Sequence, residues 1–150
     1  MDLLDVRHPG DIPAWLDIDL LARFLHDNMK PYEDTIPDAR RALEYAFSDA
    51  PGMGGFVLVA AREEQVIGSV VILDTGMAGY VPEHLLVFVG VRPSERGRGI
   101  GGWLVKEAIA RCPGAVKLHV EYDNPAKRLY ERIGFTTKYA EMRYPSEESR

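Results

Sequence analysis

The sequence predicts a mixed α/β domain, and three observations support this prediction. Four segments repeat apolar residues every three or four positions, which is the spacing of amphipathic helices. Two neighbouring β-rich segments flank a short polar turn and indicate an antiparallel hairpin. A later strand–helix–strand succession requires a parallel crossover. We therefore expect a sheet that combines both kinds of pairing, rather than a doubly wound parallel sheet.

The first part of the chain is expected to form one strand and two helices. Apolar residues predict a short strand over 3–6, and the spacing of leucines predicts a helix over 16–29. The stretch DTIPDARRALEYAF predicts a second helix, in which Thr35 caps the N-terminus and Pro37 fits the first turn.

The middle of the chain is expected to supply three strands. Residues 56–62 and 65–73 form the predicted hairpin, and a loop containing glycine and proline follows it. Residues 84–91, HLLVFVGV, are continuously apolar, which is typical of a strand covered on both faces.

The last third is expected to alternate helices and strands. Residues 100–111 carry an apolar stripe and predict a helix, whereas residues 115–122 alternate as a strand does. Asn124 is expected to cap a further helix, which Gly134 closes. Residues 135–144 are expected to be extended, as one bent strand or two short ones.

Composition limits the function classes. The 150 residues suit a single domain over 1–150, with 46% hydrophobic residues and a net charge of −5. The negative charge argues against a nucleic-acid or membrane partner. Cys112 is the single cysteine, so no internal disulfide or cysteine-based zinc site is expected and we interpret it as structural. The opening residues MDLLDVRHPG lack the features of a signal peptide, and we expect a cytoplasmic protein.

The stretch RGRGIGG, residues 96–102, fits two phosphate-binding patterns. Read from Gly97 it matches G-x-G-x-x-G, the dinucleotide fingerprint, and read from Arg96 it matches R-x-x-G-x-G, an acyl-CoA diphosphate loop. A dinucleotide turn begins directly after its strand and opens a series of parallel units. Here five residues separate Val91 from Gly97, and a single strand–helix unit follows. These facts favour the acyl-CoA interpretation.

This loop has the chemistry that a diphosphate needs. Its glycines let main-chain N–H groups approach a ligand, and the first turn of the following helix adds free N–H groups and its dipole. Arg92, Arg96 and Arg98 place three cations within seven residues of an acidic chain. A solvated loop with incidental arginines is the alternative.

Two stretches together resemble the GNAT superfamily of N-acetyltransferases. VGVRPSERGRGIGGWLV is similar to the acyl-CoA-binding motif of that family, and LHVEYDNPAKRLYERIGF is similar to its second signature. The resemblance covers most of the chain. It implies an α/β fold with a mixed, mainly antiparallel central sheet and helices on both faces. It also implies direct transfer of an acetyl group from acetyl-CoA to a small-molecule or peptide amine, without a metal.

The resemblance further implies which residues form the site. Strand 84–91 is expected to separate from strand 115–122 near Gly90, and a glycine inside a strand also suggests a bulge or a close backbone approach. Acyl-CoA is expected to contact Val89, Gly90, Val91, Arg96, Gly97, Arg98, Gly99, Ile100, Gly101, Asn124, Lys127 and Tyr130. Tyr130 takes the position of the general acid that protonates the leaving thiolate, and a core tyrosine is the alternative.

The general base is the least defined part of the expected site. Many members of the family carry a glutamate where Leu85 stands here. Glu83 is the preferred substitute, because it follows a loop that could border the acceptor pocket. His84, His119 and Glu121 are the other candidates.

The acceptor pocket is expected to include Tyr32, Tyr80, Glu83 and His84, and an acidic surface favours a cationic acceptor. The absent glutamate at Leu85 leaves a second function open, a non-catalytic acyl-CoA-binding or sensory module on the same fold. A dinucleotide-binding protein is the third and weakest interpretation. A homodimer is compatible with the family.

Overall fold

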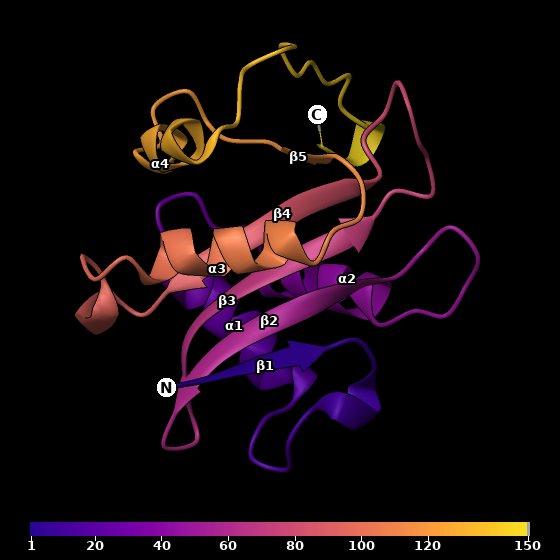
Figure 1. The fold of residues 1–150 in the computed structure, drawn as a ribbon. Coiled ribbons are helices and arrows are strands. Elements are labelled where there is room, and N and C mark those ends of the chain that lie inside the picture. Colours follow the sequence, from indigo (N-terminus) through magenta and orange to yellow (C-terminus); the bar gives the residue numbers. More distant parts are fainter. Residues whose placement is uncertain (150) are drawn as a thin grey trace. The chain divides into compact units, whose positions relative to one another are not determined.

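A computed structural model describes residues 1–149, which form two compact units. The first unit, Met1–Leu118, contains a five-stranded sheet and three α-helices (Figure 1). The second unit begins at His119 and contains the short helix α4.

The sheet has the strand order β1-β2-β3-β4-β5. Its strands are β1 (Asp2–Val6), β2 (Gly55–Arg62), β3 (Gln65–Asp74), β4 (His84–Val91) and β5 (Val116–Leu118). Neighbours from β1 to β4 pair antiparallel, and β5 pairs parallel to β4. The predicted hairpin, the parallel crossover and the mainly antiparallel sheet are therefore confirmed.

Three helices of the first unit follow the predicted periodicities, namely α1 (Ile18–Asn28), α2 (Ile36–Ala46) and α3 (Ile100–Ala110). Thr35 caps α2 as predicted, because its side chain accepts a hydrogen bond from the N–H of Asp38 at 3.2 Å. The carboxylate of Asp17 accepts from the N–H of Leu20 at 2.7 Å. This cap explains why α1 begins at Ile18 rather than at residue 16.

Helices cover both faces of the sheet, as predicted. Figure 1 shows α3 across one face, whereas α1 and α2 lie behind the other face. The core on the α1–α2 side joins buried side chains of both helices to Val57, Val59, Val71 and Phe88. On the opposite side, a Cβ built at Gly68 would lie 2.9 Å from a methyl group of Leu104, so α3 packs closely on β3.

The irregularity of β4 lies at Val87 and not at Gly90. Val71 pairs with Phe88 and Ile72 with Leu86, so Val87 is the extra residue of a β-bulge. Gly90 is a regular partner of Ser69. A Cβ on Gly90 would lie 3.4 Å from Met29 Cγ, an ordinary contact distance, so the C-terminal end of α1 packs against β4 here. No bulge forms at Gly90, and the alternative, a close backbone approach of another chain or ligand, stays a prediction.

Two further expectations about strands are wrong. The strand predicted over 115–122 ends at Leu118, and no strand forms over 135–144. Alternation of apolar residues was the signal for residues 115–122, but a strand also needs a hydrogen-bonding partner along its length. The predicted covering of β4 holds in part, because α1 and α3 both contact this strand, with one face buried and the other partly exposed.

The second unit is built around α4 (Ala126–Ile133). The side-chain oxygen of Asn124 accepts from the N–H of Ala126 at 2.9 Å, and Pro125 is the N-cap residue, so the helix begins one position later than predicted. Gly134 closes the helix with φ 126°, as predicted. The rings of Tyr130 and Phe135 meet edge to face with centroids 5.9 Å apart.

The start of β2 provides a test of the sheet. A Cβ on Gly55, which has φ +146°, would collide with the carbonyl oxygen of Ile72 on β3. We expect Gly55→Ala to lower the free energy of unfolding by at least ~3 kcal/mol, because both the backbone and the pairing must shift. Gly10→Ala meets no atom within 4 Å and is the control, with an expected change below ~0.5 kcal/mol. Urea denaturation of both variants measures the difference, and equal stabilities would contradict the described register.

Candidate active site

The loop between β4 and α3 presents main-chain N–H groups to solvent. Gly97 and Gly99 have φ of 80° and 78°, the left-handed region that glycine adopts without strain, and a Cβ on either would meet nothing within 4 Å. Gly99 is the N-cap of α3, and its carbonyl accepts a hydrogen bond from the N–H of Trp103 at 3.0 Å. The N–H groups of the first turn have no acceptor within the helix. The loop therefore offers an open anion site at a helix N-terminus.

The arginines of this loop also serve the fold. Arg92 donates twice to the carbonyl of Val66, at 3.0 and 2.8 Å. Arg96 donates from Nε to the carbonyl of Val91 at 3.0 Å and from Nη2 to the carbonyl of Asn28 at 2.9 Å. Two of the three arginines that concentrate positive charge at this loop therefore donate to main-chain carbonyls of the protein.

Of the three arginines, Arg98 is the best placed to turn towards a ligand. Its Nη1 lies 3.1 Å from Glu95, and 63% of its side chain remains exposed. Glu95 is only 12% exposed and also accepts from Arg62 at 2.8 Å. Glu95 thus keeps a cationic partner when Arg98 turns towards a ligand.

The two strands that were expected to separate do so earlier than predicted. β5 pairs with β4 only from His84 to Leu86, opposite Val116 to Leu118. Beyond Leu86, no strand among residues 1–149 pairs with β4 on the side where β5 lies. The predicted pantetheine residues 89–91 lie in this unpaired part, where the carbonyl of Val91 already accepts from Arg96.

Glu83 caps the turn between α3 and β5. Its Oε2 accepts from the N–H of Ala115 at 2.6 Å, and a side chain on Gly114 would collide with its carboxylate. Hydrogen bonds from its own N–H and from the N–H groups of Ala115 and Gly79 hold the pKa of Glu83 below its usual value. A lowered pKa weakens a carboxylate as a proton acceptor, so this geometry disfavours Glu83 as the general base.

His84 is engaged inside the fold and does not line an open pocket. The residue is 8% exposed, and its Nδ1 lies 3.0 Å from Oδ1 of Asp74. Its Nε2 is buried and has no hydrogen-bond partner among residues 1–149. The burial of His84 and its contact with Asp74 disfavour a direct contact with an acceptor, and the proposed role of His84 stays a prediction.

Tyr80 and Tyr32 lie in two different loops. Tyr80 projects from the loop before β4 with 86% of its surface exposed. Tyr32 lies between α1 and α2, where its N–H donates to the carbonyl of Met29 at 2.9 Å. Neither of the two surface grooves described below is lined by the four residues predicted for the acceptor pocket.

The second unit holds the three other predicted site residues. Asn124 and Lys127 line a groove of ≈ 530 Å³ around the start of α4. Nζ of Lys127 lies 3.5 Å from the carboxylate of Glu131. Tyr130 is buried, and this burial, reinforced by the charge of Glu121, raises the pKa of its phenol to about 12.

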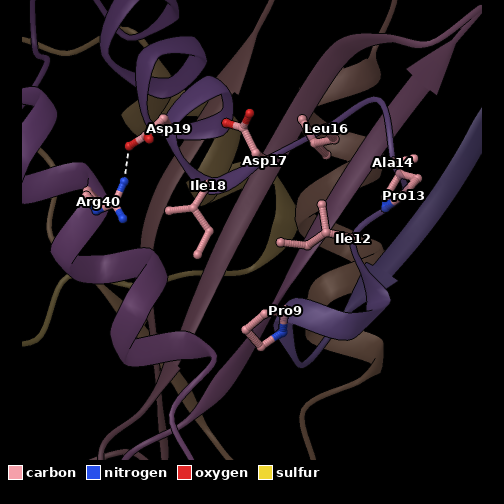
Figure 2. A pocket seen from close by; sticks show the side chains of 9 residues that line it. All are labelled: Pro9, Ile12, Pro13, Ala14, Leu16, Asp17, Ile18, Asp19 and Arg40. Carbon is pink, nitrogen blue, oxygen red and sulfur yellow. Dashed lines mark hydrogen bonds and ion pairs between the residues drawn. The ribbon is translucent and has the colours of Figure 1, made fainter.

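A second groove, of ≈ 410 Å³, lies at the N-terminal end of α1 (Figure 2). Its wall is mainly apolar, and its charged groups already have partners. Asp17 caps α1, and Asp19 pairs with Arg40. The groove lies at one end of α1, and Asn28, which Arg96 contacts, lies at the other end. The two places are ~15 Å apart, about the length of the helix. No residue predicted for the site lines it.

Three negative findings concern residues 1–149. No group of three or more His, Cys, Asp or Glu side chains could hold a metal ion. No helix is long and apolar enough to cross a membrane. Burial raises the pKa of the Cys112 thiol to about 11, so it is not an activated nucleophile, in agreement with its interpretation as structural.

Two further residues, Asn28 and Glu33, were not predicted as candidate site residues from the sequence. Asn28 ends α1, and its carbonyl receives Arg96. Glu33, next to Tyr32, has one carboxylate oxygen that is buried and has no hydrogen-bond partner among the described residues. A carboxylate in a connection between two helices is the only sequence signal for Glu33, and it does not distinguish Glu33 from Asp34.

Residues 19–135 match the acetyltransferase (GNAT) family. Mycothiol acetyltransferases are similar in sequence. The Catenulispora acidiphila protein is 29% identical over 91% of this chain and 44% of its own length. The Brachybacterium faecium protein is 32% identical over 83% of this chain and 38% of its own length. The chain thus spans less than half of these relatives.

Solved structures agree on the fold. An aminoglycoside N-acetyltransferase in complex with CoA superposes with a TM-score of 0.65 at 14% identity, covering 97% of this chain and 94% of its own. A Bacillus halodurans protein described as a transcriptional regulator has a TM-score of 0.65 at 20% identity, over 97% of this chain and 100% of its own. The fold is of the GNAT-like acyl-CoA N-acyltransferase class. The chain belongs to the acetyltransferase (GNAT) family, as its two motifs predicted.

The Glu83 contact predicts a pH-dependent contribution to stability. Because the folded state holds the pKa of Glu83 below 4.5, the ionised carboxylate stabilises the fold above that pH. This contribution is lost as the pH falls through the lowered value. We expect Glu83→Gln to unfold more easily than wild type at pH 7 and to show a smaller difference below pH 4.5.

Chemical denaturation at both pH values measures this effect. Glu64→Gln, at an exposed turn, removes the same charge and is the control. An equal loss of stability at both pH values would contradict the assigned role of the carboxylate.

Proposed function

We propose that residues 1–150 form one catalytic domain that transfers an acetyl group from acetyl-CoA directly to an amine. The observation that carries this proposal is the loop after β4. Two left-handed glycines and the N-terminus of α3 leave several main-chain N–H groups open to an anion, in the loop that follows β4, and the edge of β4 towards β5 is unpaired beyond Leu86. A diphosphate followed by an extended pantetheine arm has the shape that these two features accept.

The donor is proposed to run from the loop along β4. Residues 97–101 would receive the diphosphate, and Arg98 would add a cation. The unpaired main chain of residues 89–91 would bind pantetheine as a neighbouring strand does. Asn124 and Lys127 remain proposals for donor contacts from the second unit.

Tyr130 is proposed to donate a hydrogen bond to the leaving sulfur. Its raised pKa keeps the phenol protonated throughout the neutral and mildly alkaline range. A phenol whose pKa is about 12 transfers its proton to a thiolate unfavourably, because the thiol has a pKa ~3 units lower. The phenol thus stabilises the developing thiolate mainly as a hydrogen-bond donor.

The acceptor must lose a proton before it attacks. Glu83 remains the proposed base, acting through water from a partly exposed position, although its hydrogen bonds lower its pKa and weaken it as a proton acceptor. His119 and Glu121 are the alternatives, and buried His84 is the weakest. At neutral pH most of the amine is protonated and cannot attack, which would limit turnover. The rate should therefore rise with pH.

The acceptor is proposed to be a small cationic amine. The relatives named mycothiol acetyltransferase and the neighbour named aminoglycoside N-acetyltransferase both support a small molecule as the first acceptor class to test. The acidic chain, at −5, attracts a cation. A homodimer, a cytoplasmic location, and the absence of metal, membrane and nucleic-acid partners also remain proposals.

A non-catalytic acyl-CoA-binding module is the second candidate function. Leu85 at the family's glutamate position favours it, as does the commitment of Glu83 to a turn. Release of CoA from acetyl-CoA in the presence of polyamines, amino sugars, amino acids and peptides decides between the two. Tight CoA binding without transfer to any amine would support the module.

Gly99 tests the position of the diphosphate. We expect Gly99→Val to raise the Kd for CoA at least ~10-fold, because a branched side chain blocks the approach of the ligand and strains a left-handed backbone by ~1–2 kcal/mol. Calorimetry with CoA, and with NAD as the competing ligand, measures the effect. Tight NAD binding without CoA binding would overturn the donor assignment.

Tyr130→Phe tests the hydrogen bond to the leaving sulfur. We expect turnover to fall by about 10²–10³ with little change in CoA affinity, because the ring remains and the O–H donor is lost. Tyr122→Phe, at a residue 81% exposed, is the matched control and should keep its turnover. Steady-state kinetics measures both variants. An unchanged rate in Tyr130→Phe would return this residue to a purely packing role.

A further inference from the structure

The guanidinium of Arg96 joins the end of β4 to the end of α1, and Asn28 on α1 lies 68 positions before Arg96 in the sequence. Nε donates to the carbonyl of Val91, the last residue of β4, and Nη2 donates to the carbonyl of Asn28, the last residue of α1. Nε and Nη2 form one edge of the guanidinium fork, which is the edge used in bidentate recognition of phosphate. Two main-chain carbonyls already occupy that edge.

The end of α1 is a favourable place for this cation. The last carbonyls of a helix have no partner within the helix and carry the negative end of its dipole. The side chain of Asn28 turns back and donates to the carbonyl of Phe24 at 2.8 Å, so Asn28 is held on both sides. Its own carbonyl lies 3.5 Å from the place of a Cβ on Gly90. The end of α1 therefore packs against β4, and the two hydrogen bonds of Arg96 stabilise this contact.

The connection from α1 to α2, residues 29–35, begins at this contact. His26 Nδ1 donates to the carbonyl of Asp34 at 2.8 Å, and the N–H of Tyr32 donates to the carbonyl of Met29, so the connection folds back on the end of α1. Glu33 in this connection keeps a buried carboxylate oxygen without a hydrogen-bond partner among residues 1–149. Such an oxygen is suited to an ammonium group, because a buried unpaired acceptor is costly until a donor arrives.

We propose that Arg96 is a positioning residue and not a diphosphate ligand. It ties residues 29–35, the connection that carries Glu33 and would border the acceptor amine, to the diphosphate loop. The functional part rests on the proposed acetyl transfer. A donor bound at residues 97–101 restrains the main chain beside Arg96. Binding of the donor thereby favours the ordered form of the connection that carries Glu33, and the amine then binds to an ordered site.

Amide hydrogen exchange of residues 26–35 tests the tie without requiring activity. We expect Arg96→Ala to exchange at least about tenfold faster there than wild type, since the loss of two hydrogen bonds frees the end of α1. Arg96→Lys, which supplies a single ammonium, should lie between the two. Addition of CoA should slow this exchange in wild type and leave it unchanged in Arg96→Ala. Arg23→Ala removes an exposed arginine from α1 and is the matched control.

Kinetics then separates positioning from ligand binding. We expect Arg96→Ala to raise the KM for the amine at least about tenfold and to change the Kd for CoA less than about twofold. Arg98→Ala should do the opposite, raising the Kd for CoA. A raised Kd for CoA in Arg96→Ala with unchanged exchange of residues 26–35 would overturn the proposal.

Failure of the proposed function gives a different result. Wild type that transfers acetyl to no amine, while Arg96→Ala still exchanges faster, would contradict the proposed acetyl transfer. The same result would support the structural tie between Arg96 and residues 29–35. Circular dichroism of Arg96→Ala confirms that the variant is folded before either measurement. Arg96→Lys provides the same test if the alanine variant does not fold.

Discussion

The first unit depends on one asymmetry, the difference between the two edges of β4. On one side β3 follows β4 from His84 to Val91, and on the other side β5 pairs for three residues only. Main-chain N–H and C=O groups that lose a strand partner need another one. In the protein, Arg96 supplies a donor to the carbonyl of Val91, and a bound donor molecule is proposed to supply the others. The bulge at Val87 falls just after the last residue that pairs with β5.

Charge in this protein has a structural use that a count of charges does not reveal. Three arginines near one loop indicate an anion site, yet Arg92 and Arg96 donate to main-chain carbonyls and Arg98 shares a mostly buried carboxylate. Guanidinium groups suit this task because they present several donors in a fixed plane. These hydrogen bonds restrain the loop, and a restrained cradle of N–H groups loses less entropy on binding.

The same reasoning applies to Glu83 and His84, an acid and a histidine at the start of β4. Glu83 and His84 are adjacent titratable residues beside a loop, which is a reasonable signal for catalysis. The structure gives each a partner, the N–H of Ala115 for Glu83 and the carboxylate of Asp74 for His84. A partner changes the chemistry of a group more than its position in the sequence does, because hydrogen bonds to a carboxylate lower its pKa.

The sequence by itself determined the helices with their caps, the hairpin and the family. These features rest on local signals, such as the Thr35 cap, the Gly134 closure and the spacing of R-x-x-G-x-G, and local signals act within a few residues. The tertiary structure alone decided where β5 ends, that Val87 rather than Gly90 is the bulge, and that residues 135–144 form no strand. It also decided that Arg96 reaches Asn28. Each of these outcomes depends on a hydrogen-bond partner that is distant in sequence, and apolar spacing carries no information about which partner is present.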